Sequence, residues 1–237
     1  MTAMACWCPV PSRVRSASEN ALIIYFDQVV SADTSARVRQ ATVVLESALA
    51  DVLIDLVPSY ASLLVIFDLS RIEATTLEQQ ITALLDVAPT ASDSVGKLVE
   101  LPVYYSMESG PDLAEISRAK KVSVEEVITL HQSREYLVYA IGFAPGFAYL
   151  GEVDSRIVMP RLDTPRTSVP RGSVGIAGRQ TAVYPADSPG GWNLIGLCPE
   201  RMFDPLSEPG MPIRVGDRVR FFSISRETFL ARGGRLV

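Results

Sequence analysis

The sequence predicts an α+β protein with a helix-containing N-terminal domain and a strand-rich C-terminal domain. Two patterns lead to this prediction. In the first hundred residues, apolar strand-like runs alternate with stretches of helical periodicity. From residue 136 onward, short apolar runs are separated by glycine and proline, which is typical of an all-β barrel or sandwich. With 237 residues, 48% of them hydrophobic, the chain has enough apolar side chains for one or two cores.

The N-terminal half has the element order β-α-β-β-α-β of a ferredoxin-like domain. Residues 1–16 are expected to be a flexible tail, and the domain is expected to span 17–109. The elements are a strand at 21–26, a helix capped by Asp33, strands at 52–57 and 63–67, a helix from Thr75 or Thr76, and a strand at 98–105. The first helix places Val38, Ala41 and Leu45 on one apolar stripe.

Residues 110–135 are predicted to be a helical connector. Asp112 suits the first turn of one short helix, and Ser123 with Glu126 forms the capping-box pattern of the next. His131, the single histidine, lies near the end of the second helix. It either interacts with the terminal carbonyls of that helix, or faces a cleft at the domain junction as a catalytic acid/base or phosphate hydrogen-bonder.

Residues 136–237 are predicted to form the barrel. Its strands are expected at 136–143, 157–159, 174–176, 182–184, 194–197 and 219–224. Arginine and aromatic residues lie among its glycine and proline turns, where a rigid scaffold can present them to an anionic ligand. The candidate substrate- or nucleotide-binding residues are Gly142, Phe143, Pro145, Gly146, Arg161, Arg166, Gln180, Gly190, Gly191 and Trp192.

The proposed cleft depends on two features of these turns. Gly190 and Gly191 would let a ligand approach bare backbone beside the Trp192 indole, and Arg161 or Arg166 could bind an anion in bidentate fashion. The alternative is that Trp192 plugs the barrel and that either arginine pairs with an aspartate, Asp163 or Asp154.

Composition excludes several classes of function. A formal net charge of -5 gives no general attraction to nucleic acid, and no run approaches the roughly 18 apolar residues of a membrane span. The start of the chain lacks the apolar region of a secretory signal. Three cysteines, Cys6, Cys8 and Cys198, form no C-x-x-C pair, so neither a disulfide framework nor a metal site is indicated. The expectation is a cytoplasmic protein without a membrane anchor.

Several runs together resemble one known family, the subunit-1 family of allophanate hydrolases. They are GFAPGFAYL at 142–150, the steps Pro160-Arg161 and Pro165-Arg166, VPRGSVGIAGRQ at 169–180, SPGGWNLIG at 188–196, and Val57-Pro58-Ser59-Tyr60 in the N-terminal half. That family also holds the B subunit of bacterial 5-oxoprolinase, the Kip-type inhibitor of a histidine kinase, and a carboxyltransferase subdomain of urea carboxylase. The resemblance implies that the barrel is cyclophilin-like, and it favours a functional His131.

The resemblance implies two classes of function. The first is a component of an ATP-dependent 5-oxoprolinase, an amidohydrolase that converts 5-oxoproline to glutamate; the component would be inactive without its partners, the A and C subunits. ATP would be shared with a partner, because the chain has no P-loop motif. The second is a binding module that docks on a histidine kinase, with an allophanate hydrolase or urea carboxylase component as a third possibility. Leu197-Cys198 stands where the family commonly has Arg-Thr, which would alter activity or substrate preference.

Overall fold

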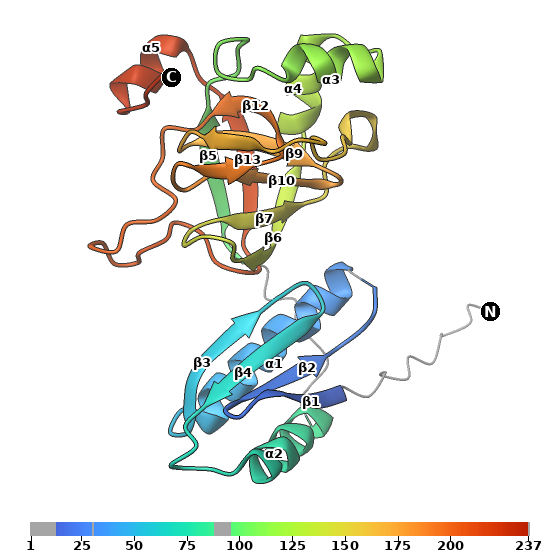
Figure 1. The fold of residues 1–237 in the computed structure, drawn as a ribbon, viewed down its shortest axis with the longest axis vertical. Coiled ribbons are helices and arrows are strands. Elements are labelled where there is room, and N and C mark those ends of the chain that lie inside the picture. Colours follow the sequence, from blue (N-terminus) through green and yellow to red (C-terminus); the bar gives the residue numbers. More distant parts are fainter. Residues whose placement is uncertain (1–12, 30, 88–95, 237) are drawn as a thin grey trace, which may run out of the picture. The chain divides into compact units, whose positions relative to one another are not determined.

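The computed structural model describes residues 13–29, 31–87 and 96–236, and the chain divides into two units, Met1–Ser94 and Val95–Val237 (Figure 1). Each unit has its own apolar core. Cys6 and Cys8 lie outside the described residues, as does most of the predicted tail.

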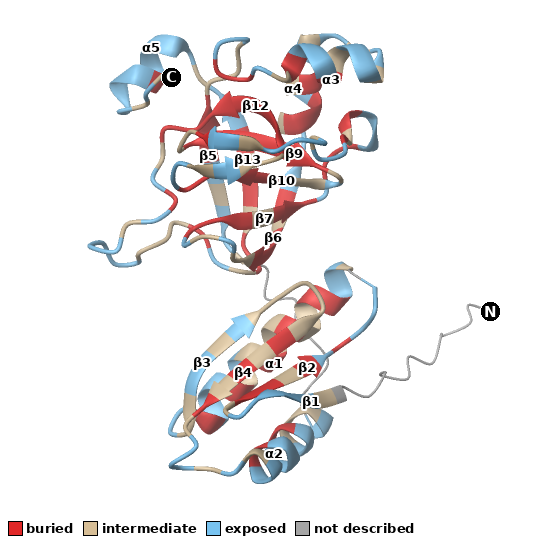
Figure 2. Ribbon diagram, in the orientation of Figure 1, coloured by how far each residue is buried: buried red, intermediate tan, exposed pale blue. Residues whose placement is uncertain are grey.

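The first unit is a four-stranded antiparallel sheet with two helices. Its elements are β1 (Arg13–Ser18), β2 (Ala21–Tyr25), α1 (Ala32–Leu49), β3 (Leu53–Pro58), β4 (Ser62–Phe67) and α2 (Ala74–Val87), with the strands in the order β1-β2-β4-β3. Alternate residues of β4, namely Leu63, Val65 and Phe67, are fully buried and pack with apolar residues of both helices. Figure 2 shows that α2 is mostly exposed, since only Leu77 and Ile81 of that helix are buried.

The ferredoxin-like arrangement is not confirmed, because two strands differ from the prediction. Arg13–Ser18, partly assigned to a tail, pairs with β2 as a hairpin. The strand at Leu98–Val103, assigned to the N-terminal domain, belongs to the sheet of the second unit. Its alternating apolar pattern fits any half-buried sheet, so the pattern alone does not select the partner strand. The first helix also begins two residues early, with Ser31 rather than Asp33 as its cap; the Ser31 hydroxyl accepts from the backbone N–H of Thr34 at 3.0 Å.

The second unit is built on a seven-stranded sheet in the order β12-β9-β10-β7-β6-β13-β5. Its elements are β5 (Leu98–Val103), α3 (Leu113–Lys120), α4 (Val124–Gln132), β6 (Glu135–Ile141), β7 (Ala148–Gly151), the 3-10 helix η1 (Ser155–Ile157), β8 (Arg166–Val169), β9 (Ser173–Ala177), β10 (Gln180–Val183), β11 (Ser188–Gly190), β12 (Asn193–Leu197), β13 (Arg218–Ser223) and α5 (Arg226–Ala231). Strands β8 and β11 form a separate two-stranded ribbon.

The sheet closes on itself almost completely. Tyr104, directly after β5, and Leu197, at the end of β12, exchange two backbone hydrogen bonds of 2.8 and 3.0 Å. These bonds join the two outer strands of the sheet, so the predicted barrel-like domain is confirmed in its coarse form. Leu197, in place of the family arginine, is buried and contributes its backbone to this closure.

Two helices predicted as a connector are part of the barrel unit. Leu113 and Ile116 of α3, together with Val127 and Leu130 of α4, are buried in the same core as the barrel strands. The start of the second helix at Ser123 is confirmed, since the Ser123 hydroxyl accepts from the backbone N–H of Glu126 at 3.0 Å. An amphipathic helix lowers its free energy by burying its apolar stripe, and the barrel supplies the surface for this.

We expect residues 95–237, expressed alone, to fold and to unfold cooperatively, because the apolar clusters of this unit contain no residue from the first unit. Urea titration followed by Trp192 fluorescence would measure this. An uncooperative, sloping transition in the fragment alongside a cooperative one in the full chain would contradict the expectation.

Candidate functional site

Two of the segments predicted to form the site lie side by side. The backbone N–H of Leu162 donates to the carbonyl of Gly191 at 2.7 Å, and the Asn193 side-chain amide donates to the carbonyl of Pro160 at 2.8 Å. The loop between Pro160 and Arg166 is therefore fixed against the turn that carries Gly190, Gly191 and Trp192. A side chain at position 190 would overlap the Tyr184 hydroxyl, which explains why a glycine stands there.

Trp192 lies in an aromatic cluster that is distinct from the main core of the barrel. The centroid of its ring is 5.5 Å from that of Phe147 and 6.1 Å from that of Tyr149. The ring centroids of Phe147 and Tyr184 are 5.3 Å apart. The indole is buried, with 4% of its surface exposed. Trp192 is thus a packed residue, close to the alternative in which it plugs the barrel. It packs, however, in a smaller cluster outside the main core.

The two candidate arginines of this loop have different roles. Arg166 donates from Nη2 to both carboxylate oxygens of Asp112, at 2.8 and 2.9 Å, and from Nη1 to the carbonyl of Trp192 at 3.2 Å. Its charge is therefore already neutralised. Arg161 is exposed, and its guanidinium carbon lies 6.0 Å from the Trp192 ring centroid. No carboxylate among the described residues forms an ion pair with Arg161, so this cation is available to a ligand.

The alternative partners proposed for these arginines are not used. Asp154 binds Arg134 and Arg156 instead, both at 3.0 Å. Hydrogen bonds from the Arg156 side chain and backbone hold the pKa of Asp154 well below its usual value. The actual partner of Arg166, Asp112, also accepts from the backbone N–H of Leu194 at 2.6 Å, which ties α3 to β12 beside the site.

The GFAPGF turn reaches the cluster through Phe147. Phe143 has a positive φ of 73° and an exposed ring that meets Phe147 edge to face at 5.2 Å. Gly142 and Pro145 flank it, and Gly146 has a φ of 83°. The site residue Gln180 begins β10, two positions before the cluster residue Ala182, so the two side chains lie on the same face of the sheet.

His131 is not at a cleft edge. It is fully buried inside the second unit, where its ring stacks on Phe221 at a centroid distance of 4.7 Å. Nδ1 is 2.8 Å from the Tyr105 hydroxyl and Nε2 is 2.9 Å from the Thr181 hydroxyl. His131 lies four positions after Val127 on α4, and Val127 belongs to the apolar stripe that packs in the core. This spacing was the signal in the sequence that His131 is buried.

The tautomer of His131 follows from its partners. The Thr181 hydroxyl donates its single proton to the carbonyl of Gly175 at 3.0 Å, so it can only accept from Nε2. Nδ1 of the neutral ring then accepts from Tyr105. Burial lowers the pKa of His131 from 6.5 to about 3, so the ring is neutral at physiological pH. The imidazole is a structural group here, and the acid/base role expected of it has no access to a ligand.

The arrangement around Arg161 is suited to binding rather than to covalent chemistry. Burial raises the pKa of Tyr184, while the positive charges of Arg161 and Arg166 oppose that rise. Burial also raises the pKa of the Cys198 thiol to about 12, so this cysteine is no nucleophile at neutral pH. In the described part of the chain, no three His, Cys, Asp or Glu side chains converge as metal ligands. We call Arg161, Trp192 and Tyr184, with the Gly190-Gly191 turn, the Arg161 site.

Sequence reasoning did not identify Asp112, Phe147 and Tyr184 as residues in or beside the candidate site. Asp112 was interpreted only as the start of a helix, and its partner Arg166 is 54 positions away. A long-range ion pair leaves no local pattern in the sequence. Phe147 lies within the run GFAPGFAYL that carried the resemblance, which was the available signal.

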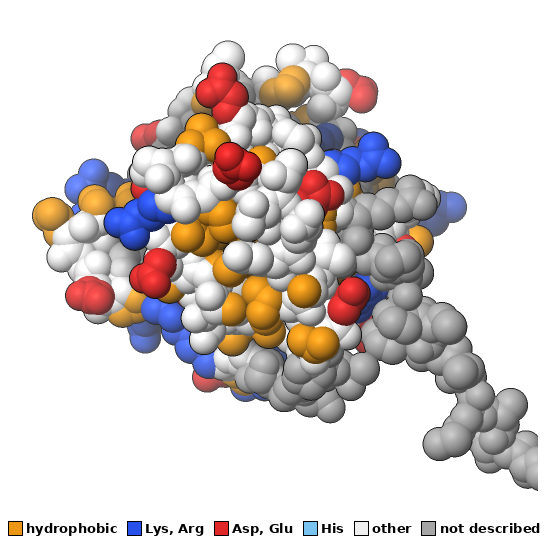
Figure 3. Space-filling model, turned by 90° about the horizontal axis from the view of Figure 1, so that it is seen from below, with side chains coloured by type: hydrophobic (Ala, Val, Ile, Leu, Met, Phe, Trp, Pro, Cys, Tyr) orange, Lys and Arg blue, Asp and Glu red, His pale blue; other side chains and the backbone are white. Residues whose placement is uncertain are grey.

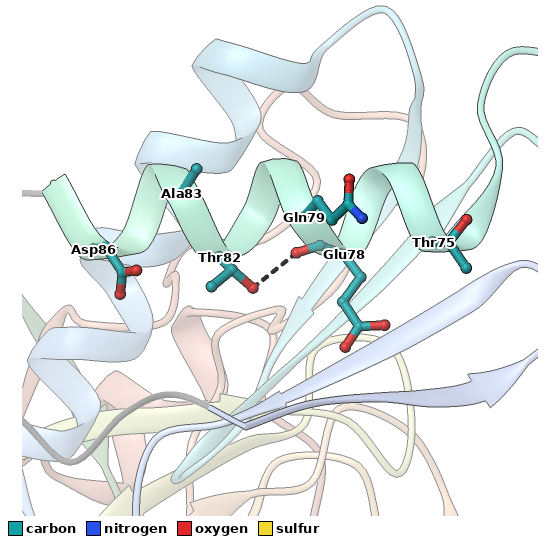
Figure 4. Close-up of a pocket in the computed structure, with 6 residues that line it drawn as sticks. All are labelled: Thr75, Glu78, Gln79, Thr82, Ala83 and Asp86. Carbon is teal, nitrogen blue, oxygen red and sulfur yellow. Dashed lines mark hydrogen bonds between the residues drawn. The ribbon is translucent and has the colours of Figure 1, made fainter.

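The first unit has a hollow of its own on the surface of α2. It is lined by six residues of that helix alone, Thr75, Glu78, Gln79, Thr82, Ala83 and Asp86. Figure 4 shows their side chains spread along this one helix, with the Thr82 hydroxyl bonded to the carbonyl of Glu78 at 2.8 Å. No basic side chain lines it. We assign it no function.

The charge distribution agrees with the mildly acidic composition. On the face drawn in Figure 3, Lys and Arg side chains lie among Asp and Glu side chains, and neither sign forms one block. No helix in the described part of the chain combines the length and apolar character that crossing a bilayer requires.

Comparison with known proteins finds a matching family model and a relative that is similar over nearly its whole length. A family model described as carboxyltransferase domain, subdomain C and D, matches residues 12–213. The B subunit of the 5-oxoprolinase of Bacillus subtilis (strain 168) is 37% identical over 230 residues, which cover 92% of this chain and 95% of that protein.

Solved structures support the fold. The crystal structure of TTHA0988 superposes with a TM-score of 0.78 at 37% identity, over 90% of this chain but only 40% of that one. The present chain thus spans less than half the length of that relative. The K. lactis urea amidolyase matches 93% of this chain and 15% of its own, with a TM-score of 0.73 at 18% identity, and shows a shared fold alone. The chain therefore belongs to the carboxyltransferase subdomain C and D family, together with the B subunits of 5-oxoprolinase to which it is similar.

Proposed function

We propose that this chain is the B subunit of an ATP-dependent 5-oxoprolinase. In that reaction 5-oxoproline, ATP and water give glutamate, ADP and phosphate. The observation that carries the proposal is the match to the Bacillus B subunit over 95% of that relative's length. A relationship of this extent includes both units of the chain rather than one shared domain.

The contribution of this subunit is to bind the anionic part of the substrate or of the nucleotide. Arg161 offers an exposed guanidinium, without a carboxylate partner in the described residues, above an indole plate. A guanidinium forms bidentate hydrogen bonds with a carboxylate or phosphate. These residues suit one anionic group. ATP would be activated with groups from a partner, since the chain has no P-loop.

The same incomplete set of groups supports a need for partner subunits. Of the described residues, His131 and Cys198 are the histidine and the cysteine, and both are buried in the unit, so neither supplies a base or nucleophile to the Arg161 site. We propose the A and C subunits of 5-oxoprolinase as those partners, and the cytoplasm as the compartment, where ATP is available. The names of the relatives do not favour the histidine-kinase inhibitor or the urea-metabolising alternatives.

We expect Arg161→Ala to lower kcat/KM for 5-oxoproline about thirtyfold in the complex reconstituted with the A and C subunits, because losing a charge-assisted contact costs about 2 kcal/mol. Arg118→Ala is the control, since Arg118 is an exposed arginine that pairs only with Glu115 of its own helix. An Arg161→Ala complex with wild-type kcat/KM would refute the site.

Binding can be measured separately from turnover. In a Trp7→Phe background, Trp192 is the single tryptophan, and 5-oxoproline or ATP bound beside Arg161 should change its fluorescence. The Arg161→Ala variant should lose this change. A reconstituted wild-type complex with no ATP-dependent hydrolysis of 5-oxoproline would contradict the proposed function itself.

A further inference from the structure

Asn193 is a buried polar side chain directly beside the Arg161 site. It begins β12 opposite Ile176 of β9, and only 1% of its surface is exposed. Its amide nitrogen Nδ2 donates to the carbonyl of Pro160 at 2.8 Å and to that of Ile176 at 3.1 Å. Because both partners are carbonyl oxygens, the group that faces them is the amide NH₂, and each of its two hydrogens has an acceptor.

The two peptide groups that flank Arg161 are both bound to the turn that carries Trp192. The carbonyl of Pro160, directly before Arg161, accepts from the Asn193 amide. The backbone N–H of the residue after Arg161 donates to the carbonyl of Gly191 at 2.7 Å. Trp192 lies between these two anchors in the chain, and the guanidinium carbon of Arg161 is 6.0 Å from the centroid of its ring. The backbone of Arg161 is thus fixed relative to the indole from both sides.

This fixation prepares Arg161 for a ligand. A long side chain loses conformational freedom when it binds, and a backbone that is already fixed reduces the entropy still to be lost. No carboxylate in the described part of the chain holds the Arg161 guanidinium by an ion pair, so the hydrogen bonds of the flanking peptides define where it stands. Those hydrogen bonds leave the charge itself available.

Of the two anchors, only the one from Asn193 depends on the identity of a side chain. Gly191 uses its main-chain carbonyl, which any residue supplies. The pairing of β12 with β9 also uses the main chain, and the next residues of β12, Leu194 and Ile195, are buried and apolar. A strand position that had only to fill space would suit such a residue, since a buried amide is unfavourable unless it is hydrogen-bonded. The bonds that the amide makes, above all the one to Pro160, account for asparagine at this position.

We infer that Asn193 is a positioning residue of the Arg161 site. Its amide holds Pro160, and so keeps the Arg161 guanidinium over Trp192, in the place where an anionic group, a carboxylate or a phosphate, is bound. Asn193 touches no ligand itself, because it is buried. This inference rests on the proposed function, which assigns the anionic group to 5-oxoproline or to ATP.

The test is a double-mutant cycle in the complex reconstituted with the A and C subunits. Asn193→Ala removes both donors without adding volume, and it should raise KM for one substrate about tenfold while kcat stays within about twofold. A rise for 5-oxoproline assigns its carboxylate to Arg161, and a rise for ATP assigns a phosphate. Added to Arg161→Ala, the Asn193→Ala change should leave the deficit in kcat/KM at about thirtyfold, whereas independent effects would multiply to about three-hundredfold.

Two further variants separate positioning from stability. Thr181→Val removes a buried hydrogen bond from the same barrel, the one to His131, so it should lower the melting temperature but leave both KM values within about twofold. Asn193→Thr replaces the alanine variant if that variant does not fold, because threonine favours strands and its single hydroxyl proton can reach only one carbonyl. It should raise the same KM, and again have no further effect beside Arg161→Ala.

The outcomes separate this inference from the proposed function. Wild-type KM values in Asn193→Ala, beside an impaired Arg161→Ala complex, overturn the positioning role alone. Deficits that multiply in the double variant, or a KM that rises equally in Thr181→Val, assign Asn193 to general stability and also overturn it. An Arg161→Ala complex with wild-type kcat/KM overturns the Arg161 site and the positioning role together.

A wild-type complex without hydrolysis of 5-oxoproline contradicts the proposed function, and the affinity of the chain then decides the role of Asn193. Dissociation constants of 5-oxoproline and of ATP are measured from Trp192 fluorescence in the Trp7→Phe background. Asn193→Ala should weaken one of them about tenfold in the presence of Arg161 and leave it unchanged in Arg161→Ala. Equal weakening in both backgrounds, or no weakening in either, overturns the inference.

Discussion

Gly172→Ala is expected to destabilise the second unit by at least about 3 kcal/mol, because it combines a left-handed backbone with an overlap of backbone atoms. Gly172 has a φ of 85°, and a Cβ there would overlap the carbonyl oxygen of Cys198. Neither Gly172 nor Cys198 can move freely. The backbone N–H of Gly172 donates to the carbonyl of Tyr184 at 2.8 Å, and the carbonyl of Gly172 accepts from the backbone N–H of Cys198 at 2.7 Å. The clash would therefore separate strands of the barrel.

Two other glycines serve as matched controls. Gly178, in the turn between β9 and β10, has a φ of 58°, and Gly233 has a φ of 83°; a Cβ at either would meet no atom within 4 Å. Alanine at these positions should cost only about 1 kcal/mol, which is the effect of the left-handed backbone alone. Urea unfolding followed by Trp192 fluorescence in the Trp7→Phe background would compare all three. Equal losses of unfolding free energy in Gly172→Ala and Gly233→Ala would show that the positive φ, and not the overlap with Cys198, determines the destabilisation.

The buried His131 should make stability fall steeply in acid. Above pH 6.5 the imidazole is neutral in both the folded and the unfolded chain. Below that pH the unfolded chain binds a proton at His131, whereas the folded chain does not until about pH 3. The free energy of unfolding should therefore drop by about 1.4 kcal/mol for each pH unit over this window. From pH 6 to pH 4 the loss from this one group is roughly 2 to 3 kcal/mol.

Two variants isolate this contribution. His131→Gln removes the titrating group, so its stability should depend less steeply on pH by about 1.4 kcal/mol per unit between pH 6 and pH 4. Thr181→Val removes the hydrogen-bond partner of Nε2 and lowers stability at pH 7, but keeps the histidine and its steep dependence on pH. Identical slopes in the wild type and His131→Gln would mean that His131 accepts a proton in the folded protein.

The sequence predicted individual elements better than their assembly. Helical periodicity placed α1, α2, α3 and α4, and apolar runs placed β2, β3 and β4, because these signals are local. The strand β1, with the sequence RVRSAS, has one strongly apolar residue and forms through its pairing with β2. Short ribbon strands such as β8 and β11 have too few residues to show a period.

The proximity of the candidate site residues was predicted in part for the same reason. Arginine and tryptophan near glycine turns correctly brought Arg161 and Trp192 together, since both lie in turns that the motifs specify. The partner of Arg166 could not be predicted, because the pairing with Asp112 depends on how α3 docks on β12. The positive φ of Phe143 likewise depends on tertiary contacts, so no feature of the sequence distinguishes it from an ordinary turn residue.

The parallel pairing of β5 with β13 has a consequence for protein synthesis. The register runs from Leu98 opposite Arg218 to Val103 opposite Ser223, a separation of 120 residues. At a translation rate of about 5–20 residues per second, the first strand of the barrel waits roughly 6 to 24 s for its partner to be made. The first unit has all its strands by then. On the ribosome, this protein should therefore carry a finished first unit while β5 still lacks its partner strand.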